Sequence, residues 1–186
     1  MLSLNEIKIG RVLQINNEPF IAIKADHHKM GRGGAVLKTK LKNLLNGNVI
    51  EKTWQGNDKA TEADIARRPA NFLYRDNQEA YFMDNENYEQ FSLPLDQLGS
   101  KEKFLKEETI VSVLYFANKP VAIDLPIKIE LKVISAPPGV KGNSAGNVMK
   151  TVELETGLNI QAPMFVNQGD IIRVNTDTGE YAERVN

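Results

Sequence analysis

The chain has 186 residues, 41% of them hydrophobic and 25% charged, which permits one to three small domains and argues against disordered and collagen-like classes. No apolar run approaches the ~18 residues that span a bilayer, and the N-terminus lacks the pattern of a secretory signal, so we expect a cytoplasmic protein. The absence of cysteine excludes disulfides and thiolate catalysis, and the formal net charge of −1 argues against a protein that coats nucleic acid indiscriminately.

Residues 1–62 are predicted to form a small barrel of short strands, SH3-like in size. The predicted strands cover residues 11–15, 20–25, 35–41 and 49–54. Asn16 to Pro19 and Asn46-Gly47 are strong turn sequences between them. Within the third strand the polar positions Lys38, Lys40 and Lys42 alternate with apolar or small ones, which predicts that the three lysines share one face.

Residues 63–126 are predicted to form a barrel of the OB type, with several short strands and one short helix. The strands are expected at residues 71–75, 80–83, 88–91, 109–115 and 121–125. Residues 94–98 favour the helix, which Gly99 ends. The segment from Ala63 to Pro69 fits either a helical turn stopped by the proline or the first strand of the new sheet.

Residues 127–186 repeat this style and predict a second OB-like barrel. Residues 127–134 alternate apolar and charged positions, and further strands are expected at 151–154, 158–162, 170–175 and 181–185. A long irregular loop occupies residues 136–147. The sequence therefore predicts an all-β fold of three small barrels, with domains at 1–62, 63–126 and 127–186.

The stretch from Lys29 to Gly34 contains three glycines in its last four positions, which suits the tip of a tight hairpin. Glycine keeps that tip slim, so Arg32 would be the one long side chain at its end. From Lys24 to Lys42 there are six Lys or Arg against one acid, a net of +5, so the rest of the chain carries −6. A basic pole on a slightly acidic body is suited to docking one end of a protein on RNA.

Other polar groups give no catalytic or metal-binding pattern. His27 and His28 have no third ligand nearby and point to opposite sides of a strand, so we predict no metal site and no cofactor. No nucleophile–base pair or phosphate-binding loop is present, which argues against an enzyme. We expect Asp84, with Glu86 and Glu89, on a solvated acidic face, and Tyr88 and Tyr181 half-buried.

Five stretches, spread over all three predicted barrels, resemble bacterial translation elongation factor P. They are Gly31-Arg32-Gly33-Gly34-Ala35 followed by Lys38-Thr39-Lys40-Leu41-Lys42-Asn43-Leu44, Val49-Ile50-Glu51-Lys52-Thr53-Trp54, Tyr81-Phe82-Met83-Asp84 with Tyr88-Glu89-Gln90, Pro138-Gly139-Val140-Lys141-Gly142, and Thr178-Gly179-Glu180-Tyr181-Ala182-Glu183-Arg184-Val185. Their order and spacing over the whole chain, more than any single piece, carry the resemblance.

The resemblance implies an N-terminal KOW-like barrel followed by two OB domains, in an elongated L shape similar to tRNA. It further implies a monomer that binds the ribosome beside the peptidyl-tRNA and stimulates peptide-bond formation where consecutive prolines stall translation. In that family the hairpin tip reaches toward the acceptor end of the tRNA. Arginine in the tip position implies rhamnosylation of Arg32 by an arginine-modifying glycosyltransferase.

Two stretches depart from the family pattern. The usual Lys-Pro-Gly-Lys-Gly tip is here Lys29-Met30-Gly31-Arg32-Gly33, which excludes a lysine-type modification at Arg32. The loop that is commonly Gly-Asp-Thr-x-Gly is here Gly142-Asn143-Ser144-Ala145-Gly146 and has lost a carboxylate.

The predicted site residues comprise the tip and the positions that would contact RNA. They are Lys29, Met30, Gly31, Arg32, Gly33 and Gly34 at the tip, and Lys38, Lys40, Lys42, Lys141, Gly142, Asn143, Ser144, Gly146, Tyr181 and Arg184 for RNA. A passive RNA-binding or ribosome-assembly module shares most of these features, and the isolated Arg32 is what argues for an elongation factor instead.

Overall fold

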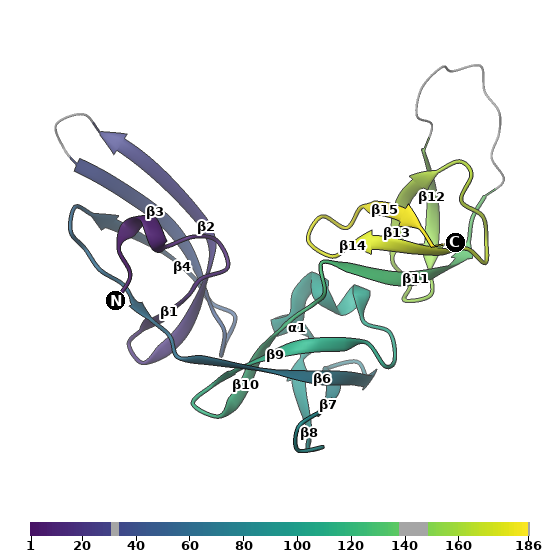
Figure 1. Ribbon diagram of the computed structural model, residues 1–186, viewed down its shortest axis with the longest axis horizontal. Helices are drawn as coiled ribbons and strands as arrows, with labels where there is room; N and C mark the ends of the chain where they lie inside the picture. Colours follow the sequence, from purple (N-terminus) through teal and green to yellow (C-terminus); the bar gives the residue numbers. More distant parts are fainter. Residues whose placement is uncertain (31–33, 138–148, 186) are drawn as a thin grey trace. The chain divides into compact units, whose positions relative to one another are not determined.

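The computed structural model describes residues 1–30, 34–137 and 149–185, and within them the fold is all-β, as predicted. The chain divides into two compact units, one of Met1–Arg68 with Val113–Ile123 and the other of Pro69–Ser112 with Asp124–Asn186. Three curled five-stranded antiparallel sheets make up the fold (Figure 1). None of the helices in the described ranges is long and apolar enough to cross a membrane.

The first sheet has the strand order β4-β3-β2-β1-β5. Its strands are β1 (Val12–Ile15), β2 (Glu18–Met30), β3 (Gly34–Asn43), β4 (Val49–Gln55) and β5 (Thr61–Glu62), preceded by the 3-10 turn η1 (Leu4–Glu6). Buried side chains from η1 and from every strand but β5, including Leu13, Leu37 and Leu41, pack into one core. The predicted Asn46-Gly47 turn is present, and Gly47 has a φ of 74°, a backbone conformation that glycine adopts without strain.

The second sheet has the order β10-β9-β6-β7-β8. Its elements are β6 (Ile65–Arg75), β7 (Glu79–Asp84), β8 (Gln90–Pro94), α1 (Leu95–Leu98), η2 (Gly99–Phe104), β9 (Ile110–Phe116) and β10 (Lys119–Asp124). The segment that fitted either a helical turn or a strand is strand, because β6 runs from Ile65 through Pro69. The predicted short helix is confirmed as α1, and Gly99 follows it with a φ of 58°.

The third sheet has the order β13-β12-β11-β14-β15. Its strands are β11 (Lys128–Ser135), β12 (Met149–Leu154), β13 (Asn159–Pro163), β14 (Ile171–Asn175) and β15 (Tyr181–Arg184). The predicted alternation in β11 is confirmed, since Ile129, Leu131 and Val133 are buried between exposed charged neighbours. Phe104 ends η2, which lies between β8 and β9 of the second sheet. Its side chain nevertheless packs into the core of the third sheet and is only 4% exposed.

Two predictions on the turn between β7 and β8 were wrong. Asp84 is 1% exposed rather than solvated, and its Oδ1 accepts a hydrogen bond from the backbone N–H of Glu86 at 2.7 Å. Tyr88 is 73% exposed rather than half-buried, and its φ of 61° places it in the left-handed region. The side chain of Asp84 is buried because it binds the backbone of its own turn.

A buried polar link joins β3 and β4. Trp54 Nε1 donates to Thr39 Oγ1 at 3.0 Å, and that hydroxyl donates in turn to the carbonyl of Lys52 at 3.0 Å. Thr39 and Trp54 are 3% and 4% exposed, so water cannot replace either bond.

Thr39→Val should therefore destabilise the first sheet by about 1–3 kcal/mol, because it leaves a buried indole N–H without an acceptor. Trp54 is the single tryptophan, so its fluorescence during urea unfolding reports on this sheet alone. Thr53→Val, on the exposed face of β4, is the matched control and should change stability by under about 0.5 kcal/mol. Equal effects of the two changes would show that the Trp54–Thr39 bond contributes nothing.

Candidate nucleic-acid interface

The hairpin that leads to the predicted tip is a long antiparallel ladder formed by β2 and β3. β2 and β3 pair from Phe20–Asn43 outward to the pair Met30–Gly34, with one register shift between Ala22 and Lys24. These strands are longer than the sequence indicated, since β2 has 13 residues and β3 has 10. Arg32 lies outside the described residues, as do Gly31 and Gly33, but it is two positions along the chain from each member of the last pair. The ladder thus fixes both strands that lead to the predicted tip.

The lysines of β3 lie as the alternation predicted. Lys38 and Lys40 are exposed and Lys42 is half-buried, while the intervening Leu37, Thr39 and Leu41 are buried. Pairing of β3 with β2 on one side and β4 on the other leaves only its outer face to solvent. One strand therefore carries three cations on a single face of the hairpin's sheet.

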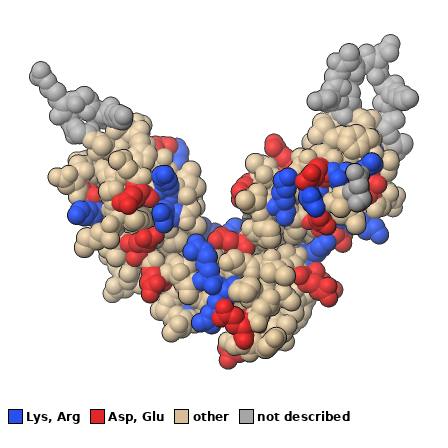
Figure 2. Space-filling view, viewed as in Figure 1, with Lys and Arg blue, Asp and Glu red and all other residues tan. Residues whose placement is uncertain are grey.

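Acidic side chains partly offset the positive charge of the lysines on β2 and β3. Lys40 Nζ lies 3.1 Å from Glu51 Oε1, and Lys24 Nζ lies 2.9 Å from Asp26 Oδ2. The hydrogen bond from Lys24 lowers the pKa of Asp26 and raises that of Lys24, so this pair stays ionised at neutral pH. On the face shown in Figure 2, Lys and Arg are interspersed with Asp and Glu rather than gathered in one positive surface.

His27 and His28 are both exposed and lie opposite Leu37 and Val36 in the ladder. Among residues 1–30, 34–137 and 149–185 no group of three His, Cys, Asp or Glu side chains could hold a metal ion.

Near the C-terminus the structure brings the predicted RNA contacts Tyr181 and Arg184 together through a third residue. Phe165 meets the Tyr181 ring edge to face at 6.5 Å, and the Arg184 guanidinium lies over Phe165 at 5.6 Å. Arg184 is also 3.6 Å from Asp170, while Phe165 is 55% exposed. The prediction that Tyr181 is half-buried is confirmed. Sequence reasoning missed Phe165, because it lies between strands where no periodicity marks it.

A network of ion pairs links β11, β14 and β15 beside this cluster. Arg173 on β14 bonds Glu130 of β11 at 2.9 Å and Glu183 of β15 at 3.3 Å, and Lys128 bonds Glu183 at 3.0 Å. Hydrogen bonds from Lys128 and Arg173 lower the pKa of Glu183.

The loop that carries Lys141, Gly142, Asn143, Ser144 and Gly146 lies outside the described residues. Its two flanks are joined, because Lys150 Nζ donates to the carbonyl of Pro137 at 3.0 Å. Lys150 is 8% exposed, so this cation is structural.

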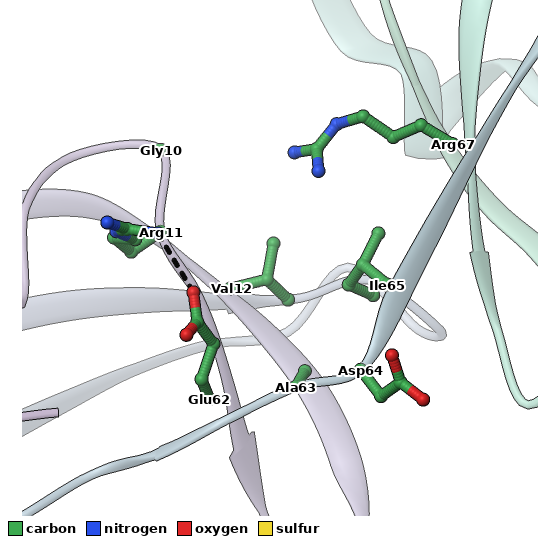
Figure 3. A pocket seen from close by; sticks show the side chains of 8 residues that line it. All are labelled: Gly10, Arg11, Val12, Glu62, Ala63, Asp64, Ile65 and Arg67. Carbon is green, nitrogen blue, oxygen red and sulfur yellow. Dashed lines mark hydrogen bonds and ion pairs between the residues drawn. The ribbon is translucent and has the colours of Figure 1, made fainter. Parts of the chain in front are cut away.

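A cavity of about 440 Å³ lies between β1 and the start of β6, and Figure 3 shows the side chains that line it. Val12, Ala63 and Ile65 form its apolar floor, and Arg67 extends over it. Arg11 turns instead to Glu62, with Nη1 and Oε1 2.9 Å apart. Two arginines and two acids line the cavity, so its formal charges balance.

Family models of known proteins match the chain in three consecutive ranges, one for each sheet, and all three models describe the same family. Residues 3–60 match the family model described as Elongation factor P (EF-P) KOW-like domain. Residues 65–123 match that of the Elongation factor P (EF-P) OB domain, and residues 129–184 match Elongation factor P, C-terminal.

Full-length relatives point to the same family. An elongation factor P of Carboxydothermus hydrogenoformans is 40% identical over 185 residues, covering 100% of both chains. One of Desulfotalea psychrophila is 42% identical over 185 residues, covering 100% of this chain and 99% of its own. A solved structure titled eukaryotic translation initiation factor 5A from Methanococcus jannaschii is 17% identical and covers 66% of this chain and 94% of its own. Its TM-score of 0.45 is too low to add to the argument. On the family models and the full-length relatives, the chain belongs to the elongation factor P family of translation factors.

Proposed function

We propose that this elongation factor binds the ribosome beside the peptidyl-tRNA and stimulates peptide-bond formation, relieving stalling at consecutive prolines. Arg32 at the hairpin tip would reach toward the acceptor end of the tRNA. The observation that carries the proposal is the β2–β3 ladder, which is paired out to Met30–Gly34 and carries a row of lysines on β3. In the sequence, Arg32 lies between the two residues of that last pair. Glycines on both sides of Arg32 leave room for close approach to RNA.

The factor would act by positioning and would not itself make or break a bond. Proline is a poor reactant because its ring fixes φ and constrains the nascent chain. Holding the peptidyl-tRNA end in a reactive pose lowers the entropic part of the activation barrier, because the reacting groups are already oriented. A tenfold gain in rate needs only about 1.4 kcal/mol, which one or two charge-assisted hydrogen bonds from Arg32 can supply.

The partners in this proposal are ribosomal RNA, ribosomal proteins and the peptidyl-tRNA. The protein would bind them as a monomer and without a cofactor or metal. Lys38, Lys40 and Lys42 would contact RNA on the hairpin, and Tyr181 with Arg184 would do so at the other end of the chain. The segment 141–146 would add a further contact. We keep the division into three domains at 1–62, 63–126 and 127–186, which the three matched family ranges support.

A cell-free translation assay tests the proposal directly. Without the protein, a reporter with a run of prolines should stall, and adding the protein should restore full-length product. A matched reporter with alanines in place of the prolines should be unaffected. Equal stimulation of both reporters would overturn the proline-specific role.

We also propose that Arg32 is rhamnosylated by an arginine-modifying glycosyltransferase. The intact mass of the natively expressed protein should exceed the sequence mass by one deoxyhexose that maps to Arg32. An active preparation with the unmodified mass would rule the modification out.

Ribosome binding should weaken as salt rises, and Lys38→Ala should reduce the slope of log affinity against log salt by about 1, because one phosphate contact is lost. Filter binding or light scattering at several salt concentrations measures this. Lys103→Ala removes an exposed lysine from η2 and should leave the slope unchanged. An unchanged slope in the Lys38 variant would place that lysine outside the interface.

A further inference from the structure

The register of β14 and β15 places Tyr181 and Arg184 on the core side of the third sheet. Residues that pair directly across two antiparallel strands project to the same face of the sheet. Arg184 pairs with Ile172 and Tyr181 pairs with Val174, and both of these partners are buried. Because β15 is the last strand in the order of its sheet, Arg184 lies at the edge of this core, with 41% of its side-chain surface exposed.

Two side chains hold the Arg184 guanidinium at this edge. Its central carbon lies 5.6 Å from the centroid of the Phe165 ring, within the range of a cation–π contact. Its Nη1 lies 3.6 Å from Asp170 Oδ2, and that oxygen is itself fixed, because it accepts the backbone N–H of Asn167 at 2.9 Å. An aromatic ring and an anchored charge therefore orient the guanidinium.

The Phe165 ring is supported in turn, although it is 55% exposed. The Tyr181 ring meets it edge to face, with centroids 6.5 Å apart and planes at 78°. The Asn167 side-chain amide donates to the backbone carbonyl of Phe165 at 3.1 Å, and the next residue, Val166, is completely buried in the core. The segment that carries the ring is thus anchored to the sheet.

The hydrogen-bond donors of Arg184 are unused within the described part of the chain. A guanidinium has five N–H donors, but Arg184 makes no hydrogen bond to another described residue, and its 3.6 Å contact with Asp170 is longer than one. Arg173 has the same exposed fraction, yet its Nε, Nη1 and Nη2 all bond to Glu130 or Glu183. Arg173 is therefore structural, whereas Arg184 is oriented and keeps its donors for a ligand.

We propose that Phe165 is a positioning residue, which holds the Arg184 guanidinium ready to bind a phosphate of RNA. An arginine fork binds a phosphate through two parallel N–H bonds, so its orientation matters as well as its charge. An arginine that moves freely must lose rotamer freedom when it binds, and fixing it in advance lowers that cost. The choice of RNA as the partner rests on the function proposed above.

Titration of the full-length, ¹⁵N-labelled protein with a short RNA hairpin at low salt tests the contact without the ribosome. The side-chain Nε–H resonance of Arg184 should shift saturably. That of Arg173, which already donates to Glu130 at 3.0 Å, should not. A glutamate-rich peptide of equal charge should leave the Arg184 resonance unshifted. A shift with the peptide that matches the shift with RNA, or no shift with RNA, would overturn the proposal.

Variants at Phe165 isolate the ring. Phe165→Leu keeps an apolar side chain without an aromatic face and should weaken RNA binding at Arg184 about threefold, whereas Phe165→Tyr should bind as wild type does. Phe165→Met is a second ring-free variant for the case in which the leucine variant fails to fold. Ile134→Ala removes another exposed apolar side chain from this sheet and is the matched control, with no expected effect. Wild-type binding by the ring-free variants would contradict the positioning role.

A double-mutant cycle on ribosome affinity distinguishes positioning from a merely structural role. Arg184→Ala should weaken ribosome binding about tenfold and lower the slope of log affinity against log salt by about 1. Phe165→Leu alone should weaken it about threefold with the slope unchanged, because the charge stays in place. In the Arg184→Ala background, Phe165→Leu should have no further effect, since it acts through the guanidinium. Equal losses in the two backgrounds would show that Phe165 does not act through Arg184.

The two arms also separate this inference from the proposed function. If the wild-type chain failed to bind ribosomes, the function proposed above would fall, whereas the RNA hairpin titration would still decide whether Phe165 orients Arg184 for a phosphate. If the wild-type chain bound ribosomes and the cycle showed equal losses in both backgrounds, only the positioning role would fall.

Discussion

Replacing Arg32 by alanine should lower the rate of peptide-bond formation between consecutive prolines at least about tenfold, close to the rate without the factor. Arginine supplies a planar fork of five donors, and losing one or two charge-assisted bonds of about 1.5–3 kcal/mol each is enough for that effect. Ribosome affinity should fall far less, because the lysines of β3 and the C-terminal cluster remain in place.

Single-turnover kinetics on a ribosome stalled at a proline pair would measure the effect. Arg32→Lys keeps the charge but loses the fork and any arginine modification, so its rate should lie between those of wild type and the alanine variant. Full rescue by Arg32→Ala would remove the role that we assign to the tip.

Phe104→Ala should destabilise the unit formed by Pro69–Ser112 and Asp124–Asn186 by about 3–5 kcal/mol. Phe104 is 4% exposed and packs among Leu131, Leu154 and Ile172, so alanine would leave a cavity in the core of the third sheet. Because the phenylalanine comes from η2, the change should also loosen the attachment of the second sheet to the third.

Calorimetric unfolding measures the decrease in the free energy of unfolding. The rates of amide hydrogen exchange in β11 and β14 should increase in the same variant. Ile110→Ala is the matched control, since Ile110 is 58% exposed, and it should cost under about 0.5 kcal/mol. A Phe104→Ala protein with the control's stability would mean that the second and third sheets fold independently.

Local patterns in the sequence were sufficient for most of the strands. The alternation of Lys38, Lys40 and Lys42 with buried neighbours, the Asn46-Gly47 turn and the short helix before Gly99 were all predicted from it. These features depend on side-chain period and on backbone conformations that few residues adopt, and both are properties of short stretches of chain.

Features that depend on contacts between distant segments needed the tertiary structure. Phe165 joins Tyr181 and Arg184 across the third sheet, and Phe104 leaves its own sheet to enter another core. A one-residue bulge gives Tyr74 its stacking partner, which no periodicity in the chain announces.

The chain's own composition and periods thus determined that it is an all-β protein, and they predict a basic hairpin with Arg32 at its tip. The tertiary structure decided which side chains meet. It buried Asp84, exposed Tyr88 and stacked Tyr74 on Tyr81. The physical reason is that strand formation follows from local side-chain alternation, whereas burial and stacking depend on which strands pair and in which register.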